Sequence, residues 1–262
     1  MLKTALTKPG PWLATSGPEE DVVLSTRGSL VRNLADLPFP ARCSEDEKRV
    51  VQERVTQAIE SAGLPKTGSY IALADLHVRE VRMLIERRLI TRHLIESRGP
   101  RGVYIANDQG LSIMVNERDH MRITAMGRGL CPLEVWNTLG RIDDSLHVPL
   151  DYAYHEKRGF LTSALYEVGT GLKLSATLHL PALTFGGHLT DVVDNAHIEH
   201  HDFDGEYGAV ATAPGGLYKL TNRSTLGYSE GEIDFHLRAF AGKLIQQERE
   251  ARTAMSNDGS LS

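Results

Sequence analysis

Cysteine is scarce in this sequence. Cys43 and Cys131 are the two in 262 residues, and neither lies in a Cys-x-x-Cys pair or at a cysteine–histidine spacing typical of metal ligands. The pattern therefore implies neither a disulfide framework nor a zinc ribbon. Reduced thiols are usual in the cytoplasm, where we expect this protein to reside.

Long apolar runs and an excess of positive charge are also lacking. No stretch of about 18 residues is apolar throughout, and the first residues contain Pro9 and Pro11 in place of the apolar core of a signal peptide. The net charge is −5 and the isoelectric point is near 6.1. We therefore expect no membrane partner, and no nucleic acid held by a broad basic surface.

The remaining composition is that of a globular protein, because 41% of the residues are hydrophobic and 24% are charged. Ser44 and Glu47 form a capping-box pattern before apolar residues at helical spacing. Apolar periodicity predicts an α+β fold with a single large antiparallel sheet flanked by helices. Strands are predicted over residues 22–24, 104–106, 111–115, 160–163, 174–180 and 217–222, and helices over residues 50–59, 78–94, 133–146 and 231–253. We expect a lead-in over residues 1–20, one domain over residues 21–254, and a polar tail over residues 255–262.

Three segments carry the most specific signals. Residues 25–33 read Ser-Thr-Arg-Gly-Ser-Leu-Val-Arg-Asn, residues 115–123 read Val-Asn-Glu-Arg-Asp-His-Met-Arg-Ile, and residues 162–173 read Thr-Ser-Ala-Leu-Tyr-Glu-Val-Gly-Thr-Gly-Leu-Lys. In this order they resemble motifs of the ATP:guanidino phosphotransferases, most closely the catalytic domain of the bacterial protein arginine kinases. The resemblance runs from Trp12 to about Arg252 and implies the guanidino kinase fold, which is glutamine synthetase-like.

Members of that family transfer the γ-phosphoryl group of MgATP to a guanidinium nitrogen, and the protein mainly aligns the reactants and neutralises phosphate charge. The resemblance implies arginines that clamp the phosphates, two glutamates that hold the acceptor, and a cysteine beside it. It gives as nucleotide-binding candidates Ser25, Arg27, His93, Arg122 and Lys173. The implied cofactor is ATP with Mg if nucleotide binding is retained, and otherwise none.

The reactive positions depart from the family pattern. Arg118 stands where the resemblance places the glutamate that accepts the proton, Ala209 replaces the second substrate glutamate, and Ala164 replaces the cysteine. A cation cannot accept that proton, and it repels a second guanidinium at contact distance. We therefore expect no confidently assigned catalytic residue.

The phosphate clamp is also weakened. The resemblance places clamp arginines at Ser29 and Asp204, and Lys173 keeps a positive charge without the planar fork of an arginine. We expect a pseudokinase with a regulatory or binding role and with weak or no catalysis. In this hypothesis the Arg118 guanidinium occupies the acceptor position and pairs with Asp204 or Glu117.

Two other interpretations remain open. An active ATP-dependent protein-arginine phosphotransferase could use rearranged carboxylates, with Glu117, Glu206 or Asp204 as substitutes. Alternatively, the histidine-rich run over residues 197–204 could bind a metal such as zinc or nickel. The weak candidate ligands are His197, His200 and His201.

Candidate partners follow from the resemblance: an active kinase paralogue, a zinc-containing activator, or an arginine-containing protein. The last predicted helix has an apolar face that would either form a homodimer or partner surface or pack on the chain's own sheet. That face consists of Phe235, Leu237, Phe240, Leu244 and Ile245. Protein arginine kinases have a further C-terminal helical domain that recognises phosphoarginine, and we expect this chain to end before one could form.

Overall fold

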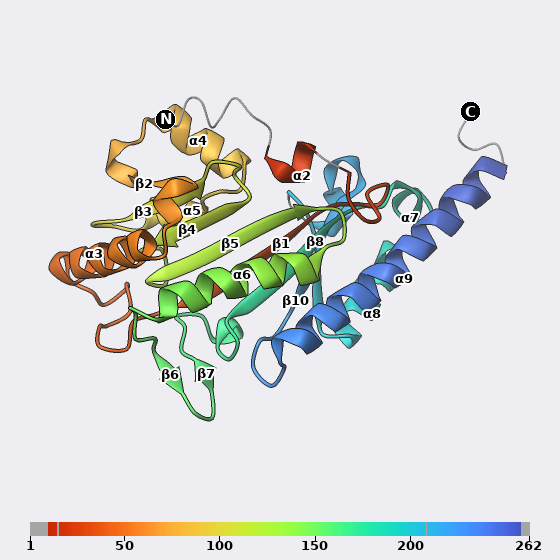
Figure 1. The fold of residues 1–262 in the computed structure, drawn as a ribbon. Coiled ribbons are helices and arrows are strands. Elements are labelled where there is room, and N and C mark those ends of the chain that lie inside the picture. The colour runs from red at the N-terminus through yellow and green to blue at the C-terminus, as the bar shows by residue number, and fades with distance from the viewer. Residues whose placement is uncertain (1–9, 15, 208, 258–262) are drawn as a thin grey trace.

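The computed structural model describes residues 10–14, 16–207 and 209–257. Its centre is an eight-stranded sheet in which all neighbouring strands are antiparallel (Figure 1). In spatial order the strands are β2 (Gly68–Ala72), β3 (Gly102–Ala106), β4 (Leu111–Val115), β5 (Met121–Arg128), β1 (Val23–Arg32), β8 (Leu172–His179), β10 (Leu217–Asn222) and β9 (His201–Gly205). The predicted single antiparallel sheet is confirmed.

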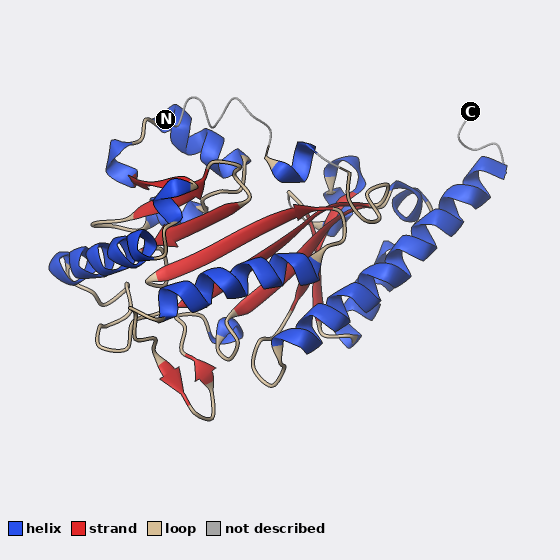
Figure 2. Ribbon diagram, viewed as in Figure 1, coloured by secondary structure: helices blue, strands red, loops and turns tan. Residues whose placement is uncertain are grey.

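Three long helices cover one face of this sheet: α3 (Glu45–Ser61), α6 (Pro132–His147) and α9 (Glu230–Asn257). Figures 1 and 2 show α6 lying across β5 and β1, and α9 lying beside it over the β8 and β10 side. The main hydrophobic core lies between these helices and the sheet. No helix within the described ranges is long and apolar enough to cross a bilayer.

Shorter helices complete the fold. Helices α4 (Val78–Glu86) and α5 (Arg92–Glu96) cover the opposite face of β3 and β4, where they form a second, smaller core. Strand alternation separates the two cores, because Val103 and Ile105 contact α4 and α5 while Tyr104 lies in the main core. The other elements are α2 (Pro11–Ala14), α7 (Pro181–Phe185), α8 (Leu189–Ile198) and the hairpin of β6 (Tyr154–His155) and β7 (Gly159–Phe160).

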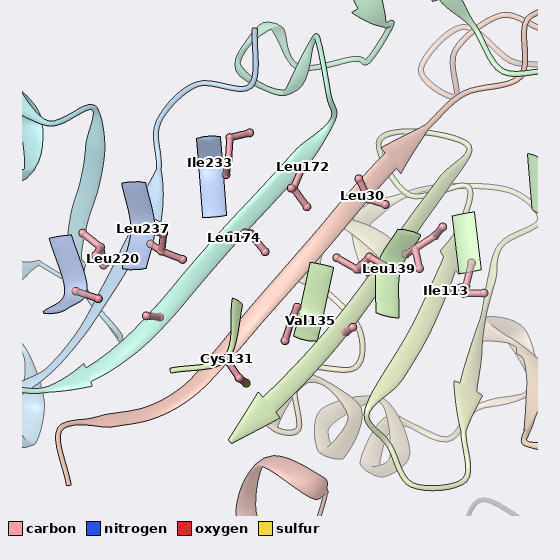
Figure 3. Packing of buried hydrophobic residues seen from close by; sticks show 14 of the residues in the cluster. Leu30, Ile113, Cys131, Val135, Leu139, Leu172, Leu174, Leu220, Ile233 and Leu237 are labelled. Atoms are coloured by element: carbon pink, nitrogen blue, oxygen red, sulfur yellow. The ribbon is translucent and has the colours of Figure 1, made fainter. Parts of the chain in front are cut away.

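Close packing of α6 on β1 decides which face of β1 is polar. A Cβ atom on Gly28 would lie 2.7 Å from side-chain atoms of Leu139 and Val135 in α6. Figure 3 shows Leu30 on the same side of β1, packed with Val135 and Leu139. Since side chains alternate along a strand, Arg27 and Ser29 point to the opposite face.

Local signals were confirmed, and some boundaries were wrong. The capping box is formed at α3, where the Ser44 amide donates to Glu47 Oε2 at 2.7 Å and the Glu47 amide donates to Ser44 Oγ at 3.2 Å. The single helix predicted over residues 78–94 is wrong: Arg88 has a φ of 59° in the left-handed region, and Thr91 caps a new helix, α5. The strand predicted over residues 160–163 is also wrong, because only Gly159–Phe160 pairs there.

The last helix is longer than predicted and reaches Asn257, so it includes the start of the expected polar tail. Residues 258–262 of that tail, and residues 1–9 and 15 of the expected lead-in, lie outside the described residues. Most of the apolar face of α9 packs on the chain's own sheet. Its buried members are Leu237, Phe240, Leu244 and Ile245, whereas Phe235 is 61% exposed.

Replacing Leu139 by alanine should destabilise the fold strongly. Leu139 is fully buried between α6 and β1, so Leu139→Ala removes apolar contacts and leaves a cavity, with a loss of about 2–5 kcal/mol in unfolding free energy. Leu133→Ala is the matched control, because Leu133 lies on the same helix and is 40% exposed. We expect the control to stay within about 0.5 kcal/mol of the parent in urea unfolding. Equal losses in the two variants would contradict this account of the core.

Candidate functional site

The sheet face opposite α6 is polar where β5, β1 and β8 lie side by side. Arg27 and Ser29 of β1 lie on this face. In the neighbouring strands, Arg122 of β5 is paired with Val31, and Lys173 of β8 is paired with Ser29. Residues directly opposite one another in antiparallel strands point to the same face. The structure therefore brings these predicted positions together, and we call Arg27, Ser29, Arg122 and Lys173 the clamp residues. Their role in nucleotide binding stays a prediction.

Arg122 is enclosed by carboxylates. Its Nη1 and Nη2 donate to the two oxygens of Glu167 at 2.9 and 3.1 Å, and its Nε donates to Glu117 Oε2 at 3.1 Å. The side chains of Glu117 and Glu167 are 1% and 4% exposed. Burial alone lowers the pKa of Arg122, but the charges of both carboxylates outweigh burial and raise that pKa above its ordinary value. Arg122 and the two carboxylates therefore form a compact, largely desolvated cluster of ion pairs.

Glu167 was missed by the sequence interpretation. It ends the short 3-10 helix Leu165–Glu167, in the segment that resembles the family's glycine-rich motif. A signal was present in the residue itself, because a glutamate adds negative charge to a segment expected to lie beside a phosphate site. The spacing alone could not show that the carboxylate reaches Arg122, 45 residues away in the chain.

Arg27 is the clamp residue most suited to an anion. Its Nε is buried without a hydrogen-bond partner among the described residues. Burial lowers the pKa of Arg27 to about 10, and the positive charges of Arg122 and Arg88 add to this effect. Glu117 and Glu206 act in the opposite direction, but neither accepts a hydrogen bond from Arg27 Nε, so a phosphate oxygen could satisfy this donor. Ser25, another predicted nucleotide contact, is buried in β1 opposite Thr177.

Arg88 also reaches the clamp residues. Its Nη2 lies 2.5 Å from Glu206 Oε1, and its Nη1 donates to Thr177 Oγ1 at 3.3 Å. Thr177 in turn donates to Glu206 Oε2 at 3.2 Å, so Glu206 is held between β8 and the end of α4. His93, the nucleotide contact predicted from this part of the chain, lies on the exposed side of α5, with Nδ1 3.6 Å from Glu96. The positive charge of Arg88 thus acts on Arg27 from a segment where only His93 was predicted to act.

The prediction for Arg118 was wrong in its contacts. Its Nη1 donates to the Tyr166 hydroxyl at 3.1 Å, and its guanidinium pairs with neither Glu117 nor Asp204. Glu117 is unavailable because it accepts from Arg122, Thr91 and the Arg118 backbone amide. The side chain of Arg118 therefore extends along the outer edge of the site and does not plug it.

The other altered positions take no part in the Arg122 ion pairs. The Lys173 ammonium donates to the backbone oxygens of Asn222 at 2.6 Å and Arg223 at 3.0 Å, so its charge is turned to the end of β10. Burial lowers the pKa of Lys173. Asp204 is exposed on β9 at the sheet edge. Ala164 is buried ahead of Glu167, and Ala209 is exposed after the β9 strand.

Other residues of the same motifs fix the backbone around the site. Arg32 points to the helix side of β1, where its Nη2 lies 2.7 Å from Asp143 Oδ2 on α6. Asn33 Nδ2 donates to Asp119 Oδ1 at 2.6 Å, and the His120 amide donates to Asn33 Oδ1 at 2.8 Å. These contacts fix the segment that carries Glu117 and Arg118 against the end of β1.

The histidine-rich run does not form a metal centre in the described part of the chain. No group of three or more histidine, cysteine, aspartate or glutamate side chains is arranged to hold an ion within those ranges. His201 is buried and stacks on Phe240, with ring centroids 5.4 Å apart, while His197 and His200 lie at the surface. The metal-binding interpretation therefore has no support from the geometry.

A large antiparallel sheet with helices packed on it is also the fold of solved guanidino kinases. Two solved structures share it: the duplicated taurocyamine kinase from Schistosoma mansoni with bound transition state analog components, and lombricine kinase. The first has a TM-score of 0.79 at 22% identity, covering 94% of this chain and 35% of that protein. The second has a TM-score of 0.78 at 23% identity, covering 97% of this chain and 76% of that protein. This likeness shows the fold.

The sequence comparisons show the family. Residues 50–251 match the model of the ATP:guanido phosphotransferase C-terminal catalytic domain. The protein-arginine kinase of Halothermothrix orenii is 36% identical over 244 residues, covering 93% of this chain and 70% of that protein. The protein-arginine kinase of Bacillus subtilis is 35% identical over 246 residues, which cover 93% of this chain and 68% of that protein. The chain belongs to the ATP:guanido phosphotransferase family and is similar to its protein-arginine kinases.

Stability should fall below neutral pH because of His120. Its Nδ1 accepts the Leu34 amide at 3.0 Å and its Nε2 lies 2.9 Å from the Pro38 oxygen, so the ring is neutral with the proton on Nε2. Burial lowers its pKa from 6.5 to about 4. As the pH falls, the unfolded chain therefore binds a proton at His120 before the folded protein does. The resulting contribution to the unfolding free energy, up to about 3 kcal/mol, is fully present above pH 6.5 and is lost as the pH falls towards 4.

Urea unfolding at several pH values, on the parent and on His120→Asn, checks this prediction. The variant should be less stable near neutral pH and should lose less stability on acidification, because its side chain does not titrate. Parallel pH profiles for the two proteins would contradict the assignment.

Proposed function

We propose that this protein is a pseudokinase of the ATP:guanido phosphotransferase family, with a binding or regulatory role and little phosphoryl transfer. The observation that carries the proposal is the bidentate ion pair between Arg122 and Glu167. Paired donors of an arginine are suited to two oxygens of a phosphate, and here two carboxylate oxygens occupy them. The buried negative charge would also repel an incoming triphosphate.

The acceptor side supports the same proposal. Arg118 provides a cation where the family resemblance places the proton-accepting glutamate, and the loss of a positioned base typically slows a reaction by roughly 10² to 10⁴. Ala209 contributes no carboxylate at the second position. A guanidinium substrate would therefore be repelled by the Arg118 cation and would lack the two carboxylates expected to bind it.

Active transfer with substitute carboxylates is less well supported. Glu117 is engaged with Arg122 and Glu206 with Arg88, so recruiting either one would break a buried ion pair. Asp204 is free of these pairs, but it is exposed on the edge strand β9, away from the carboxylates around Arg122. None of the three combines a free carboxylate with a position beside the clamp residues.

The cofactor and compartment are proposed on the same basis. Arg27 fits a phosphate group, whereas Arg122 and Lys173 are already engaged, so we propose that ATP with Mg binds weakly or not at all. Cys43 and Cys131 are free thiols, which favours the cytoplasm. An active kinase paralogue, an activator or an arginine-containing protein remain proposed partners, and a homodimer remains a proposed assembly.

Releasing Arg122 should restore nucleotide binding. Glu167→Asn removes the bidentate carboxylate and its repulsion, so MgATP and MgADP should stabilise the variant more than the parent. If the variant reaches ten times its Kd, binding adds about 1.4 kcal/mol, which raises Tm by about 3 °C for a chain of this size. Thermal-shift titration of each protein against its own nucleotide-free baseline measures this difference.

Glu199→Gln is the matched control, because it removes an exposed carboxylate that pairs with Lys243 elsewhere on the surface. It should respond to nucleotide as the parent does. A parent protein that already binds MgATP as tightly as Glu167→Asn would contradict the role given to the Arg122–Glu167 pair.

Phosphoarginine formation should be very slow. With MgATP and an arginine-rich acceptor protein, we expect phosphoarginine at least about 10²-fold below the amount formed by the protein-arginine kinase of Bacillus subtilis, because no positioned base is available. Quantitative mass spectrometry under conditions that preserve the acid-labile P–N bond measures it. Comparable phosphorylation that Arg122→Ala abolishes would show active transfer and refute the proposed function.

A further inference from the structure

The outer edge of the site has the chemistry of an anion-binding surface. We propose that Arg118, Leu165, Tyr166 and Leu226, which we call the mouth, bind an acidic peptide segment that carries a carboxylate side chain next to an apolar one. This inference rests on the proposed binding role and specifies the partner's chemistry. The site so altered would select the charge opposite to that of an arginine substrate.

Arg118 supplies an accessible cation. Its guanidinium donates to the Tyr166 hydroxyl at 3.1 Å, while Glu117 and Glu167 are paired with Arg122 and the Asp119 carboxylate accepts from Asn33 and Ser163. A guanidinium has five N–H donors in a planar fork, so most of those of Arg118 are available to a partner. A carboxylate accepted by this fork would form a charge-assisted bidentate contact.

Aromatic and aliphatic surface lies next to this cation. Tyr166 is 52% exposed and Leu165 is 88% exposed, although both are apolar enough to be buried in most folds. Leu226 is 49% exposed. It lies beside them, because the hydroxyl of the preceding residue, Thr225, donates to the Tyr166 backbone oxygen at 3.3 Å and Leu226 itself approaches Gly169. Tyrosine and arginine are among the residues that contribute most binding energy at protein interfaces, and the two leucines add apolar area beside them.

A second positive charge strengthens the selection for an anion. The Lys173 ammonium lies 5.3 Å from the centroid of the Tyr166 ring. The Tyr166 ring therefore has the Arg118 guanidinium at its hydroxyl and the Lys173 ammonium over its face. Lys173 donates its hydrogen bonds to the backbone oxygens of Asn222 and Arg223, so it adds to the positive potential beside the mouth as a charge and not as a hydrogen-bond partner.

The mouth is held in place before any ligand binds. Ser163 Oγ donates to the Arg118 oxygen at 2.7 Å, and the Ser163 amide donates to Asp119 Oδ1 at 2.7 Å. Thr225 Oγ1 also donates to the Val168 oxygen at 2.7 Å, which joins the loop that carries Leu226 to the loop that carries Tyr166. A preorganised surface loses less conformational entropy on binding than a mobile one.

Fluorescence anisotropy with three labelled peptides of equal length tests the proposal in the absence of nucleotide. One peptide alternates glutamate with leucine, the second replaces each leucine by serine, and the third replaces each glutamate by lysine. The parent should bind the first most tightly and the third least, and affinity for the first should fall as salt increases. Equal affinity for the first and third peptides, or no binding of the first at millimolar concentration, would overturn the proposal.

Charge reversal supplies the decisive comparison. Arg118→Glu should weaken binding of the glutamate–leucine peptide by on the order of ten- to a hundredfold and should favour the lysine peptide, because the charged hydrogen bonds are replaced by repulsion. Arg141→Glu, an equal change in charge at an exposed position on the helix side of the sheet, should bind as the parent does. Circular dichroism and Tm establish that both variants are folded.

Equal weakening by the two variants would attribute binding to net charge and overturn the mouth as the site. Equal affinity for the leucine and serine peptides would overturn the apolar contribution of Leu165, Tyr166 and Leu226. Peptide binding is measured separately from phosphoarginine formation. Failure of the peptide-binding proposal is therefore distinguished from failure of the proposed pseudokinase function.

Discussion

The charge balance around Arg122 is the constraint on which the site depends. A guanidinium that is 11% exposed requires compensation within the protein, and Glu117 and Glu167 supply it at hydrogen-bonding distance. Arg88 and Glu206 form a second compensated pair nearby, which leaves Arg27 as the clamp arginine whose Nε has no partner in the described chain. The interior of the site is therefore satisfied largely by its own side chains.

The fold tolerates this arrangement because the two faces of the sheet have separate tasks. On the helix side, Gly28 and Leu30 permit close packing of α6, and Arg32 pairs with Asp143. On the other face, Arg27 and Ser29 belong to the same strand but make no contribution to that core. Changes in the clamp residues can therefore abolish a phosphate site while leaving the packing that sets the sheet intact.

Local chemistry made much of the fold predictable from sequence. The Ser44–Glu47 capping box and the apolar spacing after it define α3, nearly continuous apolar runs define β3 and β4, and alternating apolar residues define β8. The break between α4 and α5 was not predictable from periodicity, because it depends on a left-handed backbone at Arg88, which is not a glycine. In the site, motif positions identified Arg27 and Arg122, but the pairing of Arg122 with Glu167 and of Arg118 with Tyr166 depends on loops brought together by the sheet.

The interior and the outer edge of the site differ in the sign of the charge that they present to a ligand. Inside, Glu117 and Glu167 place negative charge where phosphates would be held, so a polyanionic nucleotide is disfavoured despite Arg27. Outside, Arg118 directs its donors away from those carboxylates and towards the exposed ring of Tyr166. Seen from the mouth, the positive charges of Arg27 and Arg122 balance the negative charges of Glu117 and Glu167, so the interior adds little net potential there. A surface cation backed by a neutral interior can attract an anionic partner, and a transfer reaction between two substrates is not required for that role.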